Sequence, residues 1–270
     1  MTAVAPPVYV DVEGLQPSRY GLVDAASISP RWDDHMRNGV EYQPICGGGI
    51  TRDLSTCLEG AERTVIEDTM PVTWSGPVSV YKQVQCAVGS TPEQLTDRAT
   101  QGLALGESAA LETALWGPET GDDSLRLWSG DTVVLAAGAA VSLTKGLGLL
   151  EAALYPFGQG IIHAPRQVAA WAASKGLARW DNNRPVTWAG NRWSWGAYPG
   201  SDAEGDAPAA DTVWLIGTPL VTLWRSPVKI LGTDQAAWLD RSINQQTVIA
   251  VRTYVLGWAC TTQAVLISLT

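Results

Sequence analysis

The chain has 270 residues, 46% of them apolar, and its mean hydropathy is close to zero. These values argue against disorder and are typical of one large globular domain or two closely packed ones. The formal net charge is −9, with four Lys beside 14 Arg and no basic run, so composition does not indicate a dedicated nucleic-acid groove. The longest apolar run, Val133–Leu143, is too short to span a bilayer, so no membrane partner is expected.

Tryptophan is unusually frequent, with 13 Trp against a single Phe. Large amphipathic rings in such excess are typical of contact surfaces, but they also fill cores. Both interpretations stay open at this stage.

Residues 1–38 contain four prolines and little hydrophobic periodicity, which predicts an extended arm with one short helical turn at Leu22–Ala26. No Lys or Arg precedes Arg19, so the start of the sequence does not resemble a secretory leader and we expect synthesis in the cytoplasm.

The next segment is predicted to form a long two-stranded hairpin, residues 39–88, which we call the excursion. Gly39–Ile45 alternates like a strand, residues 46–60 are rich in turn formers, and Met70–Val88 again favours strand. An isolated hairpin of this size is marginal in water, so another domain or a neighbouring subunit is expected to cover it. The candidate intersubunit contacts here are Tyr42, Ile45, Ile50 and Trp74.

Ser90–Gly117 carries the most complete helix signature of the chain. Thr91 and Gln94 can form a capping box, and Pro92 occupies the first helical position. At about 1.5 Å per residue the helix would be roughly 35–40 Å long. Its expected apolar stripe consists of Leu95, Ala99, Leu103, Ala110 and Ala114, while Asp97, Arg98, Gln101, Glu107 and Glu112 fall mostly on the solvated side.

The rest of the sequence, from residue 118 on, is predicted to form short helices and strands in mixed order. Thr144 is expected to cap a helix over Lys145–Tyr155, Ile161–Ile162 reads as a buried strand, and Pro165 is expected to start a helix ending at Gly176. Short strands are expected at 125–127, 132–135, within 177–200, and at 213–216, 220–223 and 228–231, with a solvated loop at 201–210. Thr247–Trp258 and Thr262–Leu269 are predicted to form an antiparallel pair. This order indicates an α+β fold.

Catalytic and metal chemistry find little support in the sequence. The only histidines are His35 and His163; His35 follows two aspartates in the arm, and His163 reads as a satisfied structural residue at a helix entry. No nucleophile-elbow or phosphate-loop pattern occurs. We therefore expect no catalytic residue, no metal, no cofactor and no enzymatic activity.

Cysteines leave two possibilities open. Cys46 and Cys57 bracket a glycine-rich turn that a disulfide could close, with Cys86 and Cys260 as buried thiols; alternatively, Cys46 and Cys57 remain free.

The order of arm, excursion, long helix and mixed module resembles the Hong Kong 97-like fold of tailed-phage major capsid proteins and encapsulins. Three stretches resemble actinobacterial-phage shell proteins: the apical-type run Gly146–Leu154, Gly160–Pro165 and Asn191–Gly200; the terminal stretch Arg241–Asn244 through Val251–Tyr254 to Cys260; and the early pattern of Arg31-Trp32, Asn38-Gly39-Val40, Pro44, Cys46 and Cys57. Some such capsids crosslink through a lysine of the extended loop, but residues 39–80 contain none.

This resemblance implies a division into an N-terminal arm (1–38), an extended loop hairpin (39–89), a spine helix with the first part of a peripheral domain (90–143), an apical domain (144–210) and further peripheral strands (211–270). It also implies that apical residues, with Trp193 and Trp195 as candidates, meet neighbouring subunits around capsomer axes.

The implied function is structural. A major capsid protein self-assembles, as hexamers or pentamers or both, into the icosahedral head that encloses phage double-stranded DNA, after assembly in the host cytoplasm. Portal, scaffold and decoration proteins are further partners by this resemblance, and contact with packaged DNA would be weak and nonspecific. The alternatives are an encapsulin-like compartment shell and a phage tail or decoration protein.

Overall fold

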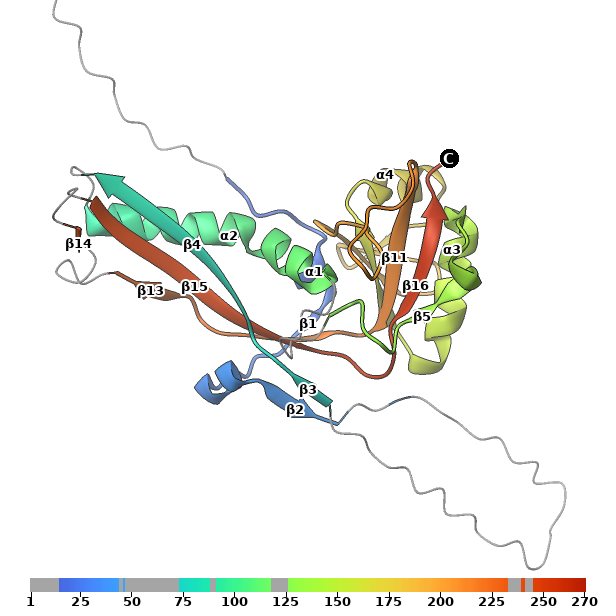
Figure 1. Ribbon diagram of the computed structural model, residues 1–270, viewed down its shortest axis with the longest axis horizontal. Coiled ribbons are helices and arrows are strands. Elements are labelled where there is room, and N and C mark those ends of the chain that lie inside the picture. Colours follow the sequence, from blue (N-terminus) through green and yellow to red (C-terminus); the bar gives the residue numbers. More distant parts are fainter. Residues whose placement is uncertain are drawn as a thin grey trace, which may run out of the picture.

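The computed structural model describes residues 15–43, 46, 73–87, 91–117, 126–232, 239–240 and 245–270. These residues form an elongated lobe and a compact lobe side by side (Figure 1). The elongated lobe consists of a six-stranded sheet with one long helix along it, and the compact lobe consists of an eight-stranded sheet with two shorter helices. We call the second the small lobe. Helices and strands are mixed without regular alternation, as the α+β prediction requires.

The elongated lobe is organised around β15 (Gln245–Gly257), which pairs antiparallel along ten residues with β4 (Val78–Ala87). Three further strands pair with β15: β12 (Thr222–Arg225), β13 (Lys229–Leu231) and β14 (Leu239–Asp240). The last strand of the sheet, β1 (Ser27–Ile28), pairs with β12. In the arm, the predicted helical turn is confirmed as α1 (Leu22–Ala25), and a 3₁₀ turn, η1 (Asp34–Asn38), follows.

The long helix is confirmed as α2 (Pro92–Trp116), with both hydrogen bonds of the capping box between Thr91 and Gln94. Its N-terminal stripe is buried as predicted, but Ala110 is exposed and Ala114 half-buried. Burial passes instead to Leu111 and Leu115, so the buried positions advance in steps of four. A step of four exceeds the 3.6 residues of one turn, so the stripe winds around the helix, as a twisted sheet underneath demands.

The sheet of the small lobe has the strand order β5-β16-β11-β7-β10-β9-β8, with β6 also beside β16. The pair β7–β10 is parallel, and the pairs β7–β11 and β11–β16 are antiparallel. The bounds of these strands are β5 (Val133–Val134), β6 (Val141–Ser142), β7 (Gly160–Pro165), β8 (Arg179–Asp181), β9 (Arg184–Val186), β10 (Arg192–Gly196), β11 (Thr212–Pro219) and β16 (Gln263–Ser268).

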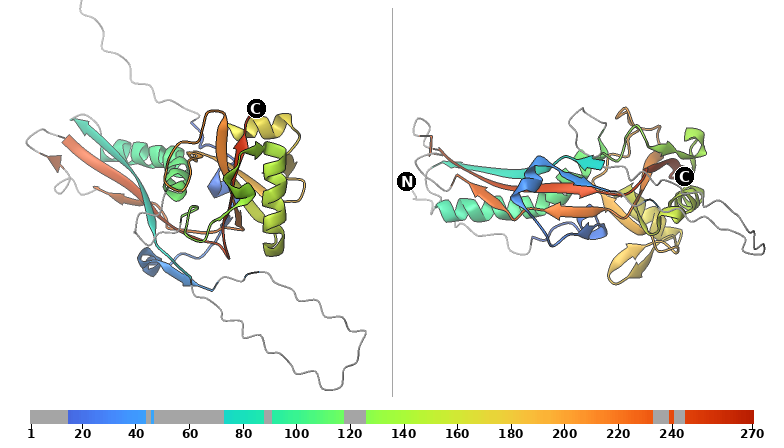
Figure 2. Two further views of the ribbon diagram at one scale, coloured as in Figure 1. Left: turned by 45° about the vertical axis from the view of Figure 1, so that its right-hand side comes forward. Right: turned by 90° about the horizontal axis from the view of Figure 1, so that it is seen from below.

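The helices of the small lobe are α3 (Leu143–Leu154) and α4 (Val168–Ser174), with the 3₁₀ turns η2 (Leu135–Gly138) and η3 (Tyr155–Phe157). The cap of α3 is Ser142 and not Thr144, because the helix begins two residues earlier than predicted. Gly146 lets α3 approach β16 closely, since a Cβ there would lie 2.5 Å from Ile267. Figure 2 shows α3 along one side of the sheet.

The predicted pairing of the two terminal strands is wrong. Within the described strands, β15 is flanked by β4 on one side and by β12, β13 and β14 on the other, so neither edge is left for β16. After Gly257 the chain crosses into the other sheet, where β16 lies between β11 and the short strands β5 and β6. Because β11 and β16 both come from residues 211–270, the boundary at residue 210 does not separate the two lobes.

Candidate assembly interface

The base of the predicted excursion is an antiparallel pair, β2 (Val40–Tyr42) with β3 (Thr73–Ser75), in which Glu41 lies opposite Trp74. This two-stranded sheet projects below the elongated lobe in Figure 1. The second half of the expected returning strand is β4, which belongs to the six-stranded sheet. The structure therefore anchors the excursion through β2 and β3. Two candidate contacts, Ile45 and Ile50, lie outside the described residues, as does the rest of 47–72.

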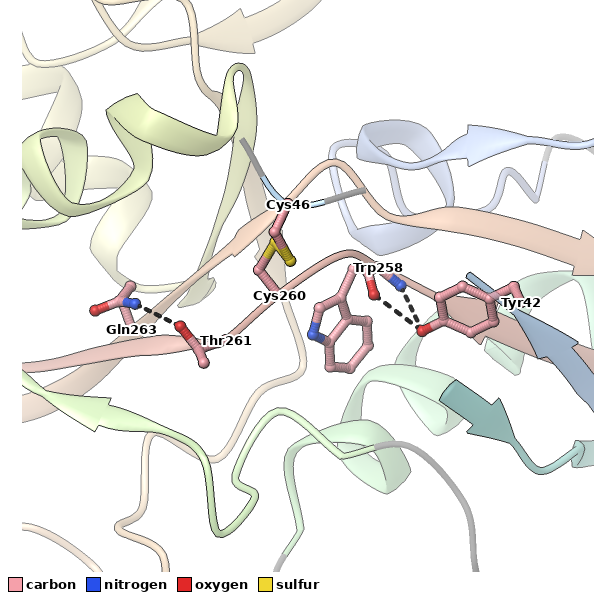
Figure 3. The surroundings of a disulfide bond; sticks show 6 residues. All are labelled: Tyr42, Cys46, Trp258, Cys260, Thr261 and Gln263. Carbon is pink, nitrogen blue, oxygen red and sulfur yellow. Dashed lines mark hydrogen bonds between the residues drawn. A yellow bond between two sulfur atoms is a disulfide. The ribbon is translucent and has the colours of Figure 1, made fainter. Parts of the chain in front are cut away.

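Tyr42 is half-buried and contacts its own subunit. Its hydroxyl donates to the carbonyl oxygen of Trp258 at 2.9 Å and accepts from the Trp258 N–H at 3.1 Å (Figure 3). Burial raises the pKa of the Tyr42 hydroxyl above its usual value, which keeps it in the protonated, donating form. Its ring also lies 6.4 Å from that of Trp224. Tyr42 thus fastens the base of the excursion to the end of β15.

Trp74, by contrast, keeps 39% of its surface exposed. The indole lies against Gly39, where an added Cβ would come within 2.6 Å of the ring. Gly39 also has a φ of 96°, a conformation that L side chains rarely adopt. The exposed ring remains a proposed contact with a neighbouring subunit.

A disulfide joins Cys46 to Cys260, across 214 residues of sequence (Figure 3). The predicted pairing of Cys46 with Cys57 is therefore wrong, as is the assignment of Cys260 as a buried thiol; Cys57 itself lies outside the described residues. The glycine-rich turn suggested a local loop closure, but the fold brings Cys46 beside the crossing between β15 and β16. The bond and the Tyr42–Trp258 contacts hold the same end of the excursion on the same crossing.

Trp193 and Trp195, the apical candidates for intersubunit contact, are corrected to core residues. Their exposed fractions are 1% and 7%, and their rings stack with centroids 5.6 Å apart. Both lie on β10, an interior strand of its sheet. A neighbouring subunit has almost no access to either ring. The resemblance suggested an intersubunit contact for the whole apical stretch, but it could not distinguish a core tryptophan from a surface one.

Glu112 is a structural residue that the sequence interpretation placed in solvent. It is 3% exposed, and its carboxylate accepts the N–H of Leu22 at 2.8 Å and the N–H of Ala197 at 2.7 Å. The hydroxyl of Ser108 donates to it as well, at 2.8 Å. One side chain of α2 thereby joins the N-terminal arm to the chain just after β10. The signal that could have found it is its neighbourhood: Leu111, Leu115 and Trp116 surround it with buried positions.

Glu107 makes a second polar connection from α2. Its carboxylate accepts from Arg252 on β15 at 2.8 and 2.9 Å and from the hydroxyl of Tyr254 at 2.7 Å. The pair is mostly shielded, with side-chain exposures of 19% for Arg252 and 13% for Glu107. Burial raises the pKa of Tyr254, so its hydroxyl stays a donor. Glu107 therefore fixes the position of the helix along the sheet.

His163 is fully buried on β7, inside a strand and not at a helix entry. Its Nδ1 lies 3.0 Å from the Tyr198 hydroxyl and its Nε2 lies 2.9 Å from that of Thr218. Burial lowers the pKa of His163 to about 3. The ring is neutral and both nitrogens have hydrogen-bond partners, which supports the structural interpretation.

The described residues contain no group of three or more His, Cys, Asp or Glu side chains placed to hold a metal. In the arm, Asp33 caps η1 and accepts from the His35 N–H, a hydrogen bond that lowers the pKa of Asp33. Among the described helices, none is long and apolar enough to cross a membrane.

No protein-family model and no curated protein matches the sequence. Solved structures do match its fold. The encapsulin SrpI of Synechococcus elongatus PCC 7942 is similar at a TM-score of 0.57 and 11% identity, covering 99% of this chain and 94% of that one. The capsid of an empty GTA particle is similar at a TM-score of 0.52 and 13% identity, covering 99% and 95%. The capsid of a native GTA particle is similar at 0.50 and 14% identity, covering 98% and 95%. The chain therefore has the Hong Kong 97-like fold of capsid and encapsulin shells.

Proposed function

We propose that this chain is the major capsid protein of a tailed bacteriophage, which self-assembles into an icosahedral shell around double-stranded DNA. The observation that carries the proposal is the match in fold over almost the full length of both chains. A catalytic domain grafted onto the fold would leave part of the chain without a counterpart. The match over 98–99% of this chain therefore supports a shell role.

The physical character of the chain supports a role in tiling. Glu107 on α2 ties the helix to the sheet of the elongated lobe, and Glu112 ties it to the segment after β10 in the small lobe, so a subunit keeps its shape. The net charge of −9 limits attraction to packaged DNA, whose dense packing and release a strongly basic shell would hinder. Contact with DNA is accordingly weak and nonspecific in this proposal.

Copies of the same chain are the principal partners, as hexamers, pentamers or both. Portal, scaffold and decoration proteins belong to the proposal as further partners, and assembly takes place in the host cytoplasm.

The alternative is an encapsulin-like compartment shell, and the likeness to SrpI favours it specifically. The two functions differ in what the shell encloses. A phage head holds double-stranded DNA, whereas a compartment shell in this proposal holds cargo enzymes.

The test has two stages. The recombinant chain is purified and its assemblies are imaged by electron microscopy; closed icosahedral shells are expected, and tubes or persistent monomers would contradict a shell function. Particles from the natural producer that contain a peptide of this chain are then isolated. They are treated with nuclease and opened. Protected double-stranded DNA supports the phage head, and protein cargo without DNA supports the compartment.

A further inference from the structure

The edge of the small lobe carries a cluster of exposed aromatic and basic side chains. We call it the basic-aromatic face; it consists of Lys175, Arg179, Arg184 and Trp188, with the acidic Asp181 opposite Arg184 in the hairpin. Trp180 follows Arg179 in β8 and therefore lies at the same edge on the other side of the strand. Trp180 and Trp188 are 60% and 70% exposed, among the most exposed large apolar side chains of the described residues. Two such rings in water at one edge are unusual for a surface that stays uncovered.

Local contacts hold this face in place. The indole N–H of Trp188 donates to the carbonyl oxygen of Gly176 at 2.7 Å, and the guanidinium of Arg179 lies 5.9 Å from the centroid of the Trp188 ring. Trp180 packs edge-on against Tyr20, with centroids 5.0 Å apart. The rings are therefore positioned before any partner arrives, which lowers the entropy cost of binding.

The sequence builds this edge with a tight hairpin. Asn182 and Asn183 connect β8 to β9, and their φ values of 47° and 64° are those of a type I′ turn. Asparagine tolerates this left-handed conformation better than most residues. The turn projects Arg179, Trp180 and Arg184 at the open edge of the eight-stranded sheet.

Charge is distributed unevenly along the small lobe. Residues 166–192 contain five basic residues and one acidic residue, a net +4. Because the whole chain carries −9, the rest carries −13. The loop at 201–211 contains four acidic residues and no basic one; we call it the acidic loop. Its acidic residues are Asp202, Glu204, Asp206 and Asp211, and all but the half-buried Asp202 are exposed.

The two charged surfaces lie on different sides of the small lobe. The hairpin β8–β9 ends one side of the sheet, whereas the acidic loop leads into β11, and the carbonyl oxygen of Asp211 accepts from Leu269 beyond the end of β16. In the right-hand view of Figure 2, the yellow hairpin and the orange loop project in opposite directions. The two charged surfaces therefore cannot contact each other within one subunit, but they can meet between two neighbouring subunits.

We propose that the basic-aromatic face of one subunit docks on the acidic loop of the next copy of this chain, around a closed ring. The inference rests on the proposed shell function and deepens it by naming the two contacting surfaces. A ring of identical subunits requires two different, complementary surfaces on each copy. Opposite charges supply that complementarity and orient the approach, while Trp and Arg are residue types enriched at interface centres.

The experiment exchanges charges between the surfaces in the full-length chain. Arg179→Glu with Arg184→Glu reverses the hairpin, and Glu204→Arg with Asp206→Arg reverses the loop. Each double variant is expected to lose rings and closed shells by sedimentation and electron microscopy, whereas the variant carrying all four changes regains them. Lys145→Glu is the control, since it makes one basic-to-acidic reversal, as each hairpin substitution does, at an exposed site at the start of α3. Its assemblies should match those of the unmodified chain.

Thermal unfolding separates misfolding from lost docking, because exposed charges should leave the midpoint nearly unchanged. Normal shells from either double variant, or no recovery in the fourfold variant, would overturn the docking proposal while leaving the shell function intact. If the unmodified chain never assembles, the shell function itself fails. A single-stranded DNA oligonucleotide tests the competing occupant: loss of DNA binding with intact assembly in Arg179→Glu/Arg184→Glu would assign this face to nucleic acid instead.

Discussion

At the scale of single residues, buried polar side chains decide how the segments of this subunit are joined. Glu112 accepts hydrogen bonds from backbone groups of the arm and of the segment after β10. A Cβ at Gly21 or Gly196 would lie within 2.5 Å of its carboxylate, so these glycines are needed for the close approach. The two glycines and the carboxylate act as one unit.

Replacing Glu112 with Ala should lower the free energy of unfolding by about 2–3 kcal/mol, since it leaves the buried Leu22 N–H and the part-buried Ala197 N–H without their acceptor. Glu112→Gln keeps one carbonyl oxygen and should lose less. Asp97→Ala, at an exposed site of the same helix, is the control and should change stability by less than about 0.5 kcal/mol. Urea denaturation measures all three, and equal stability of Glu112→Ala and Asp97→Ala would refute the role of Glu112.

His163 predicts a loss of stability in acid. Its pKa is lowered from 6.5 to about 3 by burial, so below pH 6.5 the unfolded chain binds a proton that the folded chain does not. This histidine should therefore reduce the free energy of unfolding by about 3 kcal/mol between pH 7 and pH 4. In His163→Gln, which can still bond Tyr198 and Thr218, the slope of stability against pH should be flatter. Identical slopes in His163→Gln and in the unmodified chain would contradict the assignment.

At the scale of elements, the sequence predicted what is locally encoded. The start of α2 follows from Thr91, Pro92 and Gln94, all within one turn, and its first three stripe residues are buried as expected. The second half of the stripe could not be predicted, because the drift to Leu111 and Leu115 is set by the twist of β4 and β15 beneath the helix. Those strands are brought together only by pairing across more than 150 residues, such as Val80 with Arg252.

The stripe gives a matched pair of helix variants. Leu103→Asp places a charge at a position that is 1% exposed and should cost several kcal/mol, leaving the subunit insoluble. Ala110→Asp makes a similar change on the exposed side of α2 and should be tolerated. Solubility and thermal unfolding of the two proteins test whether the stripe is buried. A soluble, normally assembling Leu103→Asp protein would show that it is not.

The Cys46–Cys260 bond gives a test of how the excursion is fastened. In the chain-entropy description, a crosslink across 214 residues stabilises the folded state by about 5 kcal/mol. Cys260→Ser should therefore unfold at a lower temperature than the oxidised protein and match the reduced one. Cys57→Ser should leave both stability and the bond unchanged. Mass spectrometry of unreduced peptides identifies the pair, and loss of the crosslink in Cys57→Ser would instead support the pairing expected from sequence.

At the scale of the whole molecule, the sequence predicted the class of fold but not the surfaces it presents. The order of elements is encoded along the chain, and it led to the shell fold that the structural comparisons support. Whether a tryptophan faces a neighbour depends on where its strand lies in a sheet: Trp193 and Trp195 lie on an interior strand, while Trp180 lies on an edge strand of the same sheet. The charge contrast between residues 166–192 and 201–211 was readable in the sequence, but its meaning depends on their placement on different sides of the lobe.

The excursion beyond β2 and β3 is the segment for which assembly and folding make opposite predictions. Its anchors, Tyr42 and Cys46, already contact the subunit on the near side. The sequence between them and β3 carries apolar residues, among them Ile50, Leu54, Val65 and Ile66, which a two-stranded ribbon alone covers poorly. We predict that this segment serves assembly more than folding, and that a neighbouring subunit covers it.

Shortening residues 47–67 to a tight turn tests that prediction. Closure entropy changes only by about (3/2)RT times the logarithm of the length ratio, so the shortened chain should unfold cooperatively near the original temperature. It should nevertheless fail to close shells, because the contacts between subunits are gone. Calorimetry and sedimentation beside the intact protein give both results. Normal shells would mean that the segment is dispensable for assembly, and a subunit that no longer folds would mean that it belongs to the core, so either result would reject the prediction. The Tyr42–Trp258 contacts and the Cys46–Cys260 bond survive the deletion, which is why loss of shells with retained folding can be attributed to the missing segment itself.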